Sequence, residues 1–327
     1  MLEGPVGLPV SERAVEQILR LEMRPERIWR TCKVTGPVFT TTTSQIYQAF
    51  LEGSDAPVAV KCTSPIEAAE QYAALKKAAE LLANSQDFRS PEPLALLGES
   101  GIIVMSWIEA PSLQHMCLNR NISVTAIREG LGACGEMLAH LHRDTRIMEK
   151  VLDTADFLHD IDLAFSGKSA PKAVKPALDL LVKTAAGVHE LDLPVTVLHG
   201  DFKSANLLLD GPATWTIDAA LKWEGAAVHD CAHFLNQFAL DLYHPRGIRF
   251  RAHLNDLERF FLQAYERTAE PVSRLPLNWL RLQKLVILYA EQLERKNRHL
   301  ASRYLASRYL ALCIRVEINR LMRKFPT

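Results

Sequence analysis

The chain has 327 residues, a formal net charge of zero and an apolar content of 48%. These values fit one large or two medium globular domains, and the balanced charge argues against bulk affinity for nucleic acid or for a membrane surface. No apolar run approaches the roughly 20 residues that a membrane span needs, and the N-terminus lacks a basic and then apolar leader. The six cysteines show no C-x-x-C spacing, which favours reduced thiols and a cytoplasmic location.

The N-terminal part predicts one helix followed by strands. Ser11 is a suitable N-cap for a helix over residues 11–30, because apolar residues follow it at helical spacing. Strands are expected over residues 33–35, 38–43, 45–51 and 58–61. Between two of them, Thr43 and Ser44 belong to a run of hydroxyl residues whose hydroxyl and backbone N–H groups can bind phosphate oxygens. The alternative is that the threonines only favour β structure.

The middle of the chain alternates helices with apolar strands. A helix over residues 66–83 follows Lys61, and two strands over residues 94–97 and 102–105 precede the segment Ser106 to Glu109. Another helix is expected over residues 123–143, where apolar residues form one face. Residues 144–193 are mixed and mostly helical, and residues 250–325 are helical.

The stretch from Val197 to Asp210 carries the strongest chemical signal. An apolar run ends in His199-Gly-Asp201, Asn206 follows, and after a second strand, a turn and a third strand comes Asp218. This order predicts that Asp201, Asn206 and Asp218 lie at the mouth of one small hairpin. Phosphoryl transfer needs such a set, because one carboxylate accepts the proton of the attacking hydroxyl while an amide and a carboxylate hold Mg²⁺ against the nucleotide phosphates.

The pattern H-G-D-x-x-x-x-N resembles the loop of the aminoglycoside phosphotransferase and choline kinase-like group. The sequence H-G-D-F-K-x-x-N is also similar to that of the ecdysteroid kinase-like branch. The resemblance implies an α+β, two-lobed protein-kinase-like fold. Residues 1–105 would form a small antiparallel sheet lobe with one main helix, which binds the nucleotide. Residues 106–327 would form a larger, mostly helical lobe, with residues 144–193 and 250–327 as walls of the acceptor site.

The resemblance also implies nucleotide-binding residues in the N-terminal lobe. Lys61 ends a strand similar to the V-A-I-K strand of kinases and would bridge the α- and β-phosphates. Its partner would be Glu70, which precedes an Ala-Ala-Leu run as in the family, with Glu67 and Glu80 as alternatives. A hairpin with Thr43 and Ser44 would cover the phosphates, although the usual glycine-rich pattern is absent.

The segment after residue 105 is typical of a kinase hinge. The adenine would contact the backbone C=O of Ser106 and the backbone N–H of Ile108, with Met105 behind the base. ATP is the expected co-substrate, and GTP stays open.

In the catalytic loop, the resemblance implies that Asp201 is the base and that Asn206 and Asp218 bind Mg²⁺. Lys203 would contact the γ-phosphate, or it is an exposed loop lysine. Asp230 would cap a helix and order the catalytic loop, with His142 as a structural histidine beneath that loop. Ala219-Ala220 departs from the family pattern, where relatives supply a further acidic residue, so the number of Mg²⁺ ions stays open.

The expected partner is a small-molecule alcohol, and neither nucleic acid nor a membrane is expected. Aminoglycosides, amino alcohols, sugars, homoserine and lipid or steroid alcohols are all open as acceptors; an aminoglycoside or choline would need acidic residues, for which Asp153, Asp156, Asp160 and Asp162 are candidates. A protein kinase is disfavoured by Gly200, which replaces the usual Arg, and by the short gap from Asp218 to Asp230. A catalytically silent kinase fold with a regulatory role is the other alternative. The Arg-rich C-terminal tail is either an anion-attracting wall or a solvated helix face that offsets acidic residues. The oligomeric state is not predicted.

Overall fold

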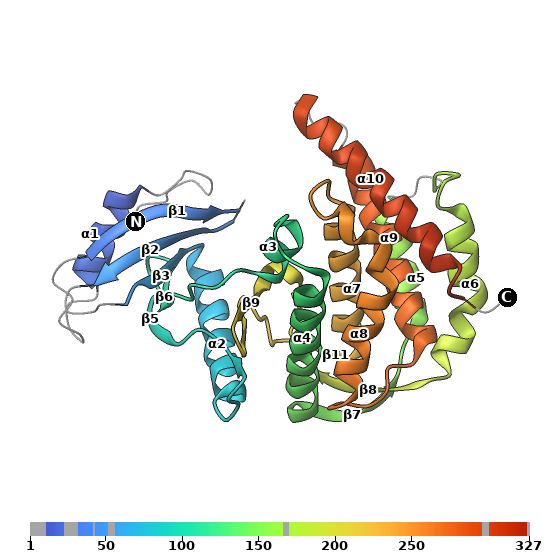
Figure 1. Cartoon of the computed structure of the whole chain (residues 1–327), viewed down its shortest axis with the longest axis horizontal. Coiled ribbons are helices and arrows are strands. Elements are labelled where there is room, and N and C mark those ends of the chain that lie inside the picture. The colour runs from blue at the N-terminus through green and yellow to red at the C-terminus, as the bar shows by residue number, and fades with distance from the viewer. Residues whose placement is uncertain are drawn as a thin grey trace. The chain divides into compact units, whose positions relative to one another are not determined.

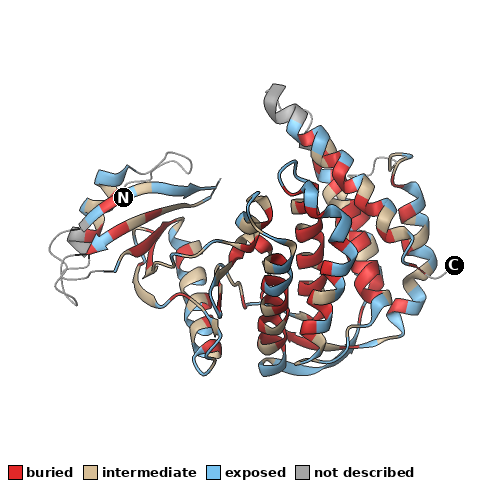
Figure 2. Cartoon of the chain, in the orientation of Figure 1, coloured by how far each residue is buried: buried red, intermediate tan, exposed pale blue. Residues whose placement is uncertain are grey.

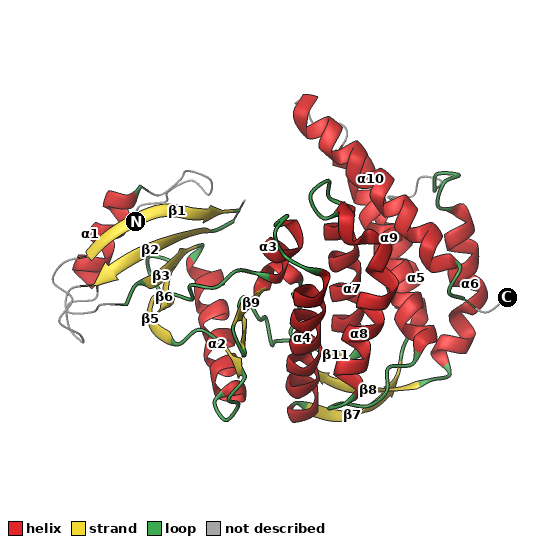
Figure 3. Ribbon diagram, viewed as in Figure 1, coloured by secondary structure: helices red, strands yellow, loops and turns green. Residues whose placement is uncertain are grey.

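The computed structural model describes residues 11–22, 32–41, 43–51, 56–165, 170–295 and 301–325. The chain divides into two compact units, here called the sheet unit (Met1–Ala110 with Leu208–Leu221) and the helical unit (Pro111–Leu207 with Lys222–Thr327). The α+β class with an antiparallel N-terminal sheet and a mostly helical remainder is confirmed (Figure 3). The prediction placed two lobes at residues 1–105 and 106–327. It did not include the return of residues 208–221 to the sheet unit.

The sheet unit is built on a five-stranded antiparallel sheet of order β1-β2-β3-β6-β5 (Figure 1). Its strands are β1 (Cys32–Thr40), β2 (Gln45–Leu51), β3 (Val58–Cys62), β5 (Pro93–Leu97) and β6 (Ile102–Ser106). All five residues of β3 are buried, as expected for the central strand of a sheet that is covered by other elements. Helix α2 (Pro65–Leu82) follows directly and is capped by the Ser64 side chain, which accepts a hydrogen bond from the Glu67 N–H.

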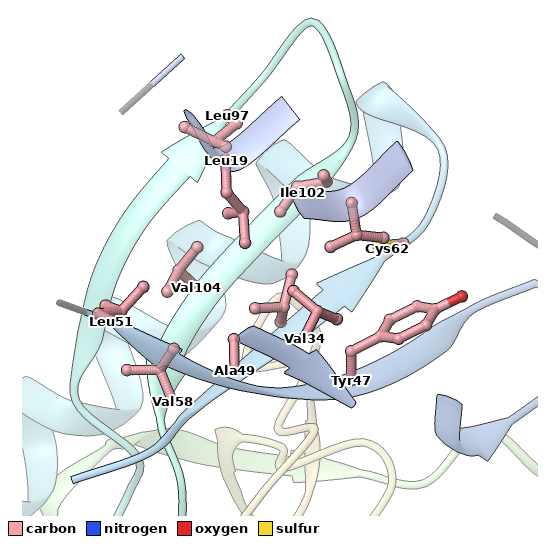
Figure 4. Close-up of a cluster of buried hydrophobic side chains, with 12 residues drawn as sticks. Leu19, Val34, Tyr47, Ala49, Leu51, Val58, Cys62, Leu97, Ile102 and Val104 are labelled. Atoms are coloured by element: carbon pink, nitrogen blue, oxygen red, sulfur yellow. The ribbon is translucent and has the colours of Figure 1, made fainter. Parts of the chain in front are cut away.

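Helix α1 (Glu12–Glu22) contributes to the apolar core of this sheet. Val15 and Leu19 are buried in a cluster that includes Tyr47 and Val104, and Figure 4 shows Leu19 of the helix with the side chains of the strands. Ser11 accepts a hydrogen bond from the Ala14 N–H, so its predicted N-cap role is confirmed. The remainder of the predicted helix, residues 23–30, lies outside the described residues.

A second, three-stranded sheet brings distant parts of the chain together. Its order is β4-β10-β9, with β4 (Phe88–Arg89), β9 (Leu207–Asp210) and β10 (Ala213–Thr216). Strand β10 runs parallel to β4, and the Lys77 ammonium donates a hydrogen bond to the carbonyl of Leu221. These contacts attach the hairpin to the first hundred residues of the chain. The sequence predicts the hairpin but not β4.

The helical unit contains α3 (Leu113–Leu118), α4 (Val124–Asp144), α5 (Thr154–Ala164), α6 (Lys175–His189), α7 (Val228–Tyr243), the 3₁₀ helices η1 (Ser204–Asn206) and η2 (Ile248–His253), α8 (Leu254–Glu266), α9 (Arg274–Arg295) and α10 (Ala301–Met322). The helix expected over residues 123–143 is confirmed. The helical structure expected over residues 250–325 is confirmed in the described residues, except for a break over residues 267–273. A small antiparallel sheet of β7 (Arg146–Val151), β8 (Asp192–Val197) and β11 (Glu224–Ala226) leads into the loop that begins at Leu198. Strands β7 and β11 were not predicted.

Helices α4 and α8 pack closely at a glycine. A Cβ atom at Gly135 would lie 2.5 Å from the carbonyl oxygen of Phe261 and 3.1 Å from the Ala264 Cβ. Real Cβ atoms do not approach a carbonyl so closely, so glycine is required for this separation. Buried residues line the facing sides of α4, α7, α8 and α9 (Figure 2).

A buried ionic network joins α8, α9 and α10. The Arg281 guanidinium, 1% exposed, donates to Glu258 at 2.6 Å and to Glu317 at 3.1 Å. Arg320 also pairs with both glutamates, and Lys324 pairs with Glu258 at 2.7 Å. These cations lower the pKa of Glu258 against the burial that would raise it. Two basic residues of the Arg-rich tail therefore offset buried carboxylates.

Candidate active site

The loop between β8 and β9 presents Asp201 with several donors. Lys203 Nζ lies 2.6 Å from Asp201 Oδ2, and Asn206 Nδ2 donates to the same oxygen at 2.9 Å and to the Asp201 carbonyl at 3.0 Å. His233 Nε2, from α7, lies 3.5 Å from Asp201 Oδ1. Burial raises the pKa of Asp201, but the donors from His233, Lys203 and Asn206 outweigh it and hold that pKa below its usual value. Asp201 is therefore ionised at neutral pH.

The orientation of Asn206 follows from these bonds. Because Nδ2 donates both of its contacts to Asp201, Oδ1 is the amide atom that is left to accept a donor or a cation. Asn206 ends the one-turn helix η1 and is itself 5% exposed, so its side chain is held rather than free to rotate.

Asp230 holds the first residues of the loop from below. Its Oδ2 accepts a hydrogen bond from the His199 N–H at 2.7 Å, and its Oδ1 accepts one from the Gly200 N–H at 3.1 Å. His142 Nε2 lies 3.1 Å from Oδ2, and its Nδ1 lies 2.8 Å from the Tyr265 hydroxyl. Burial raises the pKa of Asp230, but the hydrogen bond from His142 and the charges and N–H groups around it lower the pKa to about 2.

The predicted ordering role of Asp230 and the structural role of His142 beneath the loop are confirmed by these bonds. The prediction that Asp230 caps a helix is wrong. Helix α7 begins at Val228, and no side chain caps it. Asp230 lies inside its first turn, where the carboxylate serves the loop instead of the helix terminus.

A second anchor, missed by the sequence prediction, fixes the other end of the loop. The Ser204 hydroxyl donates a hydrogen bond to Asp241 Oδ2, and Gln114 Nε2 donates to Asp241 Oδ1 at 2.7 Å. Burial raises the pKa of Asp241 against these two bonds. Because Ser204 lies two residues before Asn206, this contact ties η1 to α7 and α3. The distance in sequence between Asp241 and the motif does not indicate this contact.

In the sheet unit, Lys61 pairs with Asp218. Lys61 is 7% exposed, and its Nζ lies 2.6 Å from Asp218 Oδ1, although 157 residues separate the two in the sequence. Asp218 follows β10 and has a φ of 56°, a conformation that costs free energy for a residue with a Cβ and that concentrates at functional sites. The structure thus brings together the predicted phosphate-binding lysine and the predicted metal-binding aspartate.

The three candidate glutamates for Lys61 differ in their surroundings. Glu67 accepts a hydrogen bond from the Thr63 hydroxyl at 2.5 Å. That bond, with a smaller effect of the Lys61 charge, lowers the pKa of Glu67. Glu70 and Glu80 are exposed on α2. The Lys61 charge thus acts on Glu67, and the pairing of Lys61 with Glu70 stays a prediction.

The turn between β1 and β2 is organised by Thr41. Its Oγ1 accepts hydrogen bonds from the N–H of Thr43 at 3.2 Å and of Ser44 at 2.9 Å. The Thr43 carbonyl accepts a hydrogen bond from the Thr63 hydroxyl at 3.1 Å. The two N–H groups predicted to bind phosphate therefore have an internal acceptor, and a ligand would have to replace it.

The predicted adenine contacts lie at the end of β6. The Ser106 N–H donates to the Glu92 carbonyl at 3.0 Å, and the Ser106 hydroxyl accepts from the Glu92 N–H at 2.9 Å. Within the described chain, the N–H of Ile108 makes no hydrogen bond. Met105, Ser106 and Ile108 are each partly exposed. The segment thus offers a donor without a partner at the position predicted to meet the base.

The two predicted metal ligands lie in different units of the chain, Asn206 in the helical unit and Asp218 in the sheet unit. Among the described residues, no group of three or more His, Cys, Asp or Glu side chains could hold a metal alone. Mg²⁺ is ordinarily held by one or two protein carboxylates or amides, with phosphate oxygens and water completing an octahedron. The amide oxygen of Asn206 and the carboxylate of Asp218, whose side chain is 38% exposed, are ligand types that Mg²⁺ accepts, and their binding of the ion stays a prediction.

Among the described helices, none combines the length and the apolar character that a membrane crossing requires.

Comparison with known proteins identifies the class. Residues 47–271 match the phosphotransferase enzyme family, and the chain belongs to that family. It is a phosphotransferase with the two-part kinase-like fold described above.

Solved structures agree on the fold. A choline/ethanolamine kinase family protein from Mesorhizobium loti is 16% identical, with a TM-score of 0.64, and covers 96% of this chain and 95% of its own. A glucosamine kinase in complex with glucosamine, ADP and inorganic phosphate is 16% identical, with a TM-score of 0.58, over 98% of this chain and 84% of its own. Spectinomycin phosphotransferase APH(9)-Ia, in complex with ADP and spectinomycin, is 14% identical, with a TM-score of 0.57, over 97% and 100%. No curated protein sequence matches.

Proposed function

We propose that the protein transfers the γ-phosphate of ATP to a hydroxyl group of a small molecule such as an aminoglycoside, an amino alcohol or a sugar. The observation that carries this proposal is the set of contacts around Asp201. A lysine, an amide and an imidazole surround one ionised carboxylate on a loop that Asp230 and Asp241 hold in place. Solved structures of similar fold contain ADP or AMP-PNP, which supports a nucleotide co-substrate.

In the proposed reaction, Asp201 orients the acceptor hydroxyl. The acceptor oxygen forms a bond to the γ-phosphorus while the bond from that phosphorus to the bridging oxygen of ADP breaks, and the proton of the hydroxyl passes to Asp201. Because the pKa of Asp201 is below its usual value, the carboxylate is a weak base. Positioning and charge neutralisation therefore supply most of the rate.

The basic residues neutralise the phosphates. Lys61 binds the α- and β-phosphates, and its present partner Asp218 becomes available to a metal when the lysine turns to the nucleotide. Lys203, now paired with Asp201, contacts the γ-phosphate. Asn206 Oδ1 and the Asp218 carboxylate would hold Mg²⁺, which would offset the negative charge on the phosphates. The backbone of Ser106 and Ile108 binds the adenine beside Met105, and GTP is an alternative donor.

One observation favours a second candidate, a nucleotide-binding protein without transferase activity. The N–H groups of Thr43 and Ser44 already donate to Thr41, and the hairpin lacks the glycine-rich pattern. A kinase fold that binds nucleotide weakly, for a regulatory purpose, would tolerate such a turn.

The test is nucleotide-induced stabilisation followed by turnover. A ligand present at about 100 times its Kd stabilises the folded state by roughly 2.7 kcal/mol, which thermal melting resolves. We expect a shift of Tm with Mg·ATP, or with Mg·GTP, that EDTA reduces and that Asp218→Ala abolishes. Asp210→Ala removes an exposed aspartate from the same hairpin and should retain the shift.

Two outcomes separate the candidates. A magnesium-dependent shift with phosphoryl transfer to an alcohol supports the transferase. A shift without transfer to any hydroxyl compound supports the binding protein. An unchanged Tm with both nucleotides contradicts both.

A further inference from the structure

The helical unit contains a cavity of about 430 Å³ that none of the residues around Asp201 lines. Its lining comes from the start of α4, the end of η2 and the first turns of α8. Sites for small molecules have volumes of about 300–1,000 Å³, so the cavity has room for a small organic compound. It lies within one unit and is separate from the candidate active site.

Helices α4 and α8, which form most of this cavity, lie side by side (Figure 1). Arg128 of α4 contacts Phe260 of α8, and further along both helices Glu136 pairs with Arg267 at 2.5 Å. The two helices therefore run in the same direction, and the first residue of α4, Val124, lines the cavity. Because the first turn of a helix carries a partial positive charge, this end of the pair favours an anion.

Three polar side chains of the lining have no partner in the protein. Within the residues that the structure describes, the side chains of Arg128, His253 and Gln263 make neither a hydrogen bond nor an ion pair. A guanidinium and a side-chain amide both carry N–H donors. The cavity therefore offers unused hydrogen-bond donors, one of them on a permanent cation.

The one carboxylate of the lining is already paired. Asp256 Oδ1 accepts a hydrogen bond from Arg259 Nη2 at 2.6 Å. With Arg128 and Arg259 set against Asp256, the lining keeps one positive charge in excess. A cationic ligand would meet this excess and find its only carboxylate occupied, whereas an anionic ligand would find Arg128 without a counter-ion.

An apolar surface adjoins this cation. The Arg128 guanidinium lies over the Phe260 ring, 4.3 Å from the ring centroid, as in a cation–π contact. The edge of the same ring lies against Gly132, where a Cβ atom would be 3.0 Å from Phe260 Cε1. Val124 and Leu257 add aliphatic surface to the lining. The cavity thus combines an anion-binding group with a surface for an apolar body.

The elements around the cavity are held in place by contacts of their own. Arg249 of η2 donates hydrogen bonds to the carbonyls of Asn119 and Arg120, and it donates to the Ile122 carbonyl at 2.8 Å. These bonds tie η2 to the segment that leads into α4. Because a preformed site loses little free energy to ordering when a ligand binds, the cavity is suited to binding a small molecule.

We propose that this cavity binds a small organic anion, which carries a carboxylate or a phosphate ester on an apolar body. Arg128 binds the anionic group, and Val124, Leu257 and Phe260 contact the apolar body. The site is additional to the proposed transfer of phosphate at Asp201. It does not depend on that reaction, because no residue of the candidate active site takes part.

The experiment is calorimetric titration of the full-length protein with benzoate and with phenyl phosphate, which share an aromatic body and differ in the anionic group. Mg·ADP is present throughout, so that phenyl phosphate does not bind at a nucleotide site. We expect at least one of the two anions to bind with a Kd of about 1 mM or lower. Neutral benzamide, and inorganic phosphate without an apolar body, should bind about tenfold more weakly or not at all.

Variants of Arg128 locate the binding. Arg128→Met should raise the Kd of the bound anion by about tenfold or more, as for the loss of one charge-assisted hydrogen bond. Arg128→Lys keeps the charge without the guanidinium plane and should retain part of the affinity. Arg315→Met, the matched control, removes an exposed arginine of α10 that has no hydrogen bond or ion pair among the described residues, and should leave the Kd unchanged. Thermal melting shows whether each variant folds.

Three results would overturn the inference. They are the absence of binding by both anions at about 10 mM, binding of benzamide as tight as that of the anions, and a wild-type Kd in Arg128→Met. The proposed function is judged separately, from the response of the same protein to Mg·ADP, so a failure of one does not count against the other.

Discussion

Replacement of Asp230 by asparagine tests how the catalytic loop is held. The carboxylate accepts from two backbone N–H groups and from His142 in a buried position. Asparagine keeps the shape but carries one NH₂ group, which must face a donor. We therefore expect Asp230→Asn to lower both the free energy of unfolding and kcat.

The magnitude follows from the pKa. A carboxyl whose pKa falls from 3.8 to about 2 on folding contributes about 2 kcal/mol of stability at neutral pH. A buried donor that is left unpaired adds about 1–3 kcal/mol. The expected loss for Asp230→Asn is thus about 3–5 kcal/mol at pH 7.

The pH dependence has a definite sign. Because the folded-state pKa of Asp230 is depressed, its contribution is present above the unfolded pKa of 3.8 and is lost as the pH falls towards 2. The free energies of unfolding of wild type and Asp230→Asn in urea should therefore differ by a constant amount from pH 7 to about pH 5, and below about pH 4 the difference should narrow to the roughly 1–3 kcal/mol of the unpaired donor. Asp210→Asn, at an exposed position, should change the free energy of unfolding by less than about 0.5 kcal/mol. Equal stability of wild type and Asp230→Asn at pH 7 would refute this account of the loop.

Three further predictions concern the reaction and the packing. Asp201→Asn should lower kcat by about 10²–10⁴-fold with nucleotide binding retained, and turnover at the wild-type rate would disprove its role. Arg281→Met would leave two buried glutamates short of a cation and should cost about 3–5 kcal/mol in urea unfolding; a loss below 1 kcal/mol would contradict that. Gly135→Ala forces a methyl group against the carbonyl of Phe261 and should cost about 1–3 kcal/mol, whereas Gly98→Ala, with nothing within 4 Å, should be neutral in the same thermal melt.

The fold could be predicted from the sequence wherever the local sequence pattern and the tertiary packing agree. The helix at 124–144 has a serine cap and one apolar face, and β3 is an uninterrupted apolar run. Strand β7 was missed because all its residues are exposed, so neither alternation nor an apolar run marks it. The pairing of β4 with β10 joins short segments more than a hundred residues apart, which no local pattern encodes.

The contacts of the candidate site could likewise be predicted from the sequence only in part. The motif residues Asp201 and Asn206 are close together in the chain, so spacing alone suggests their meeting. The supporting contacts of Asp241 and His233 come from α7 and depend on how that helix packs. His233 carries one weak signal, since it lies three residues after Asp230 and so on the side of the helix that faces the loop. The preference for Glu70 over Glu67 came from a motif, and the structure adds that the Thr63 hydrogen bond and, to a smaller degree, the Lys61 charge lower the pKa of Glu67.

The course of the chain has a consequence for biosynthesis. The chain passes between its units after Ala110, after Leu207 and after Leu221, so no single cut releases an intact half. A ribosome that has made the first five-stranded sheet must still produce about a hundred further residues before that unit receives its last two strands, and until then buried Lys61 has no Asp218 beside it. The sheet unit can therefore be completed only after synthesis of the segment that follows the loop of Asp201. In nascent chains that end before residue 218 the sheet unit should remain incompletely folded. This enzyme is therefore a useful subject for studying folding during translation.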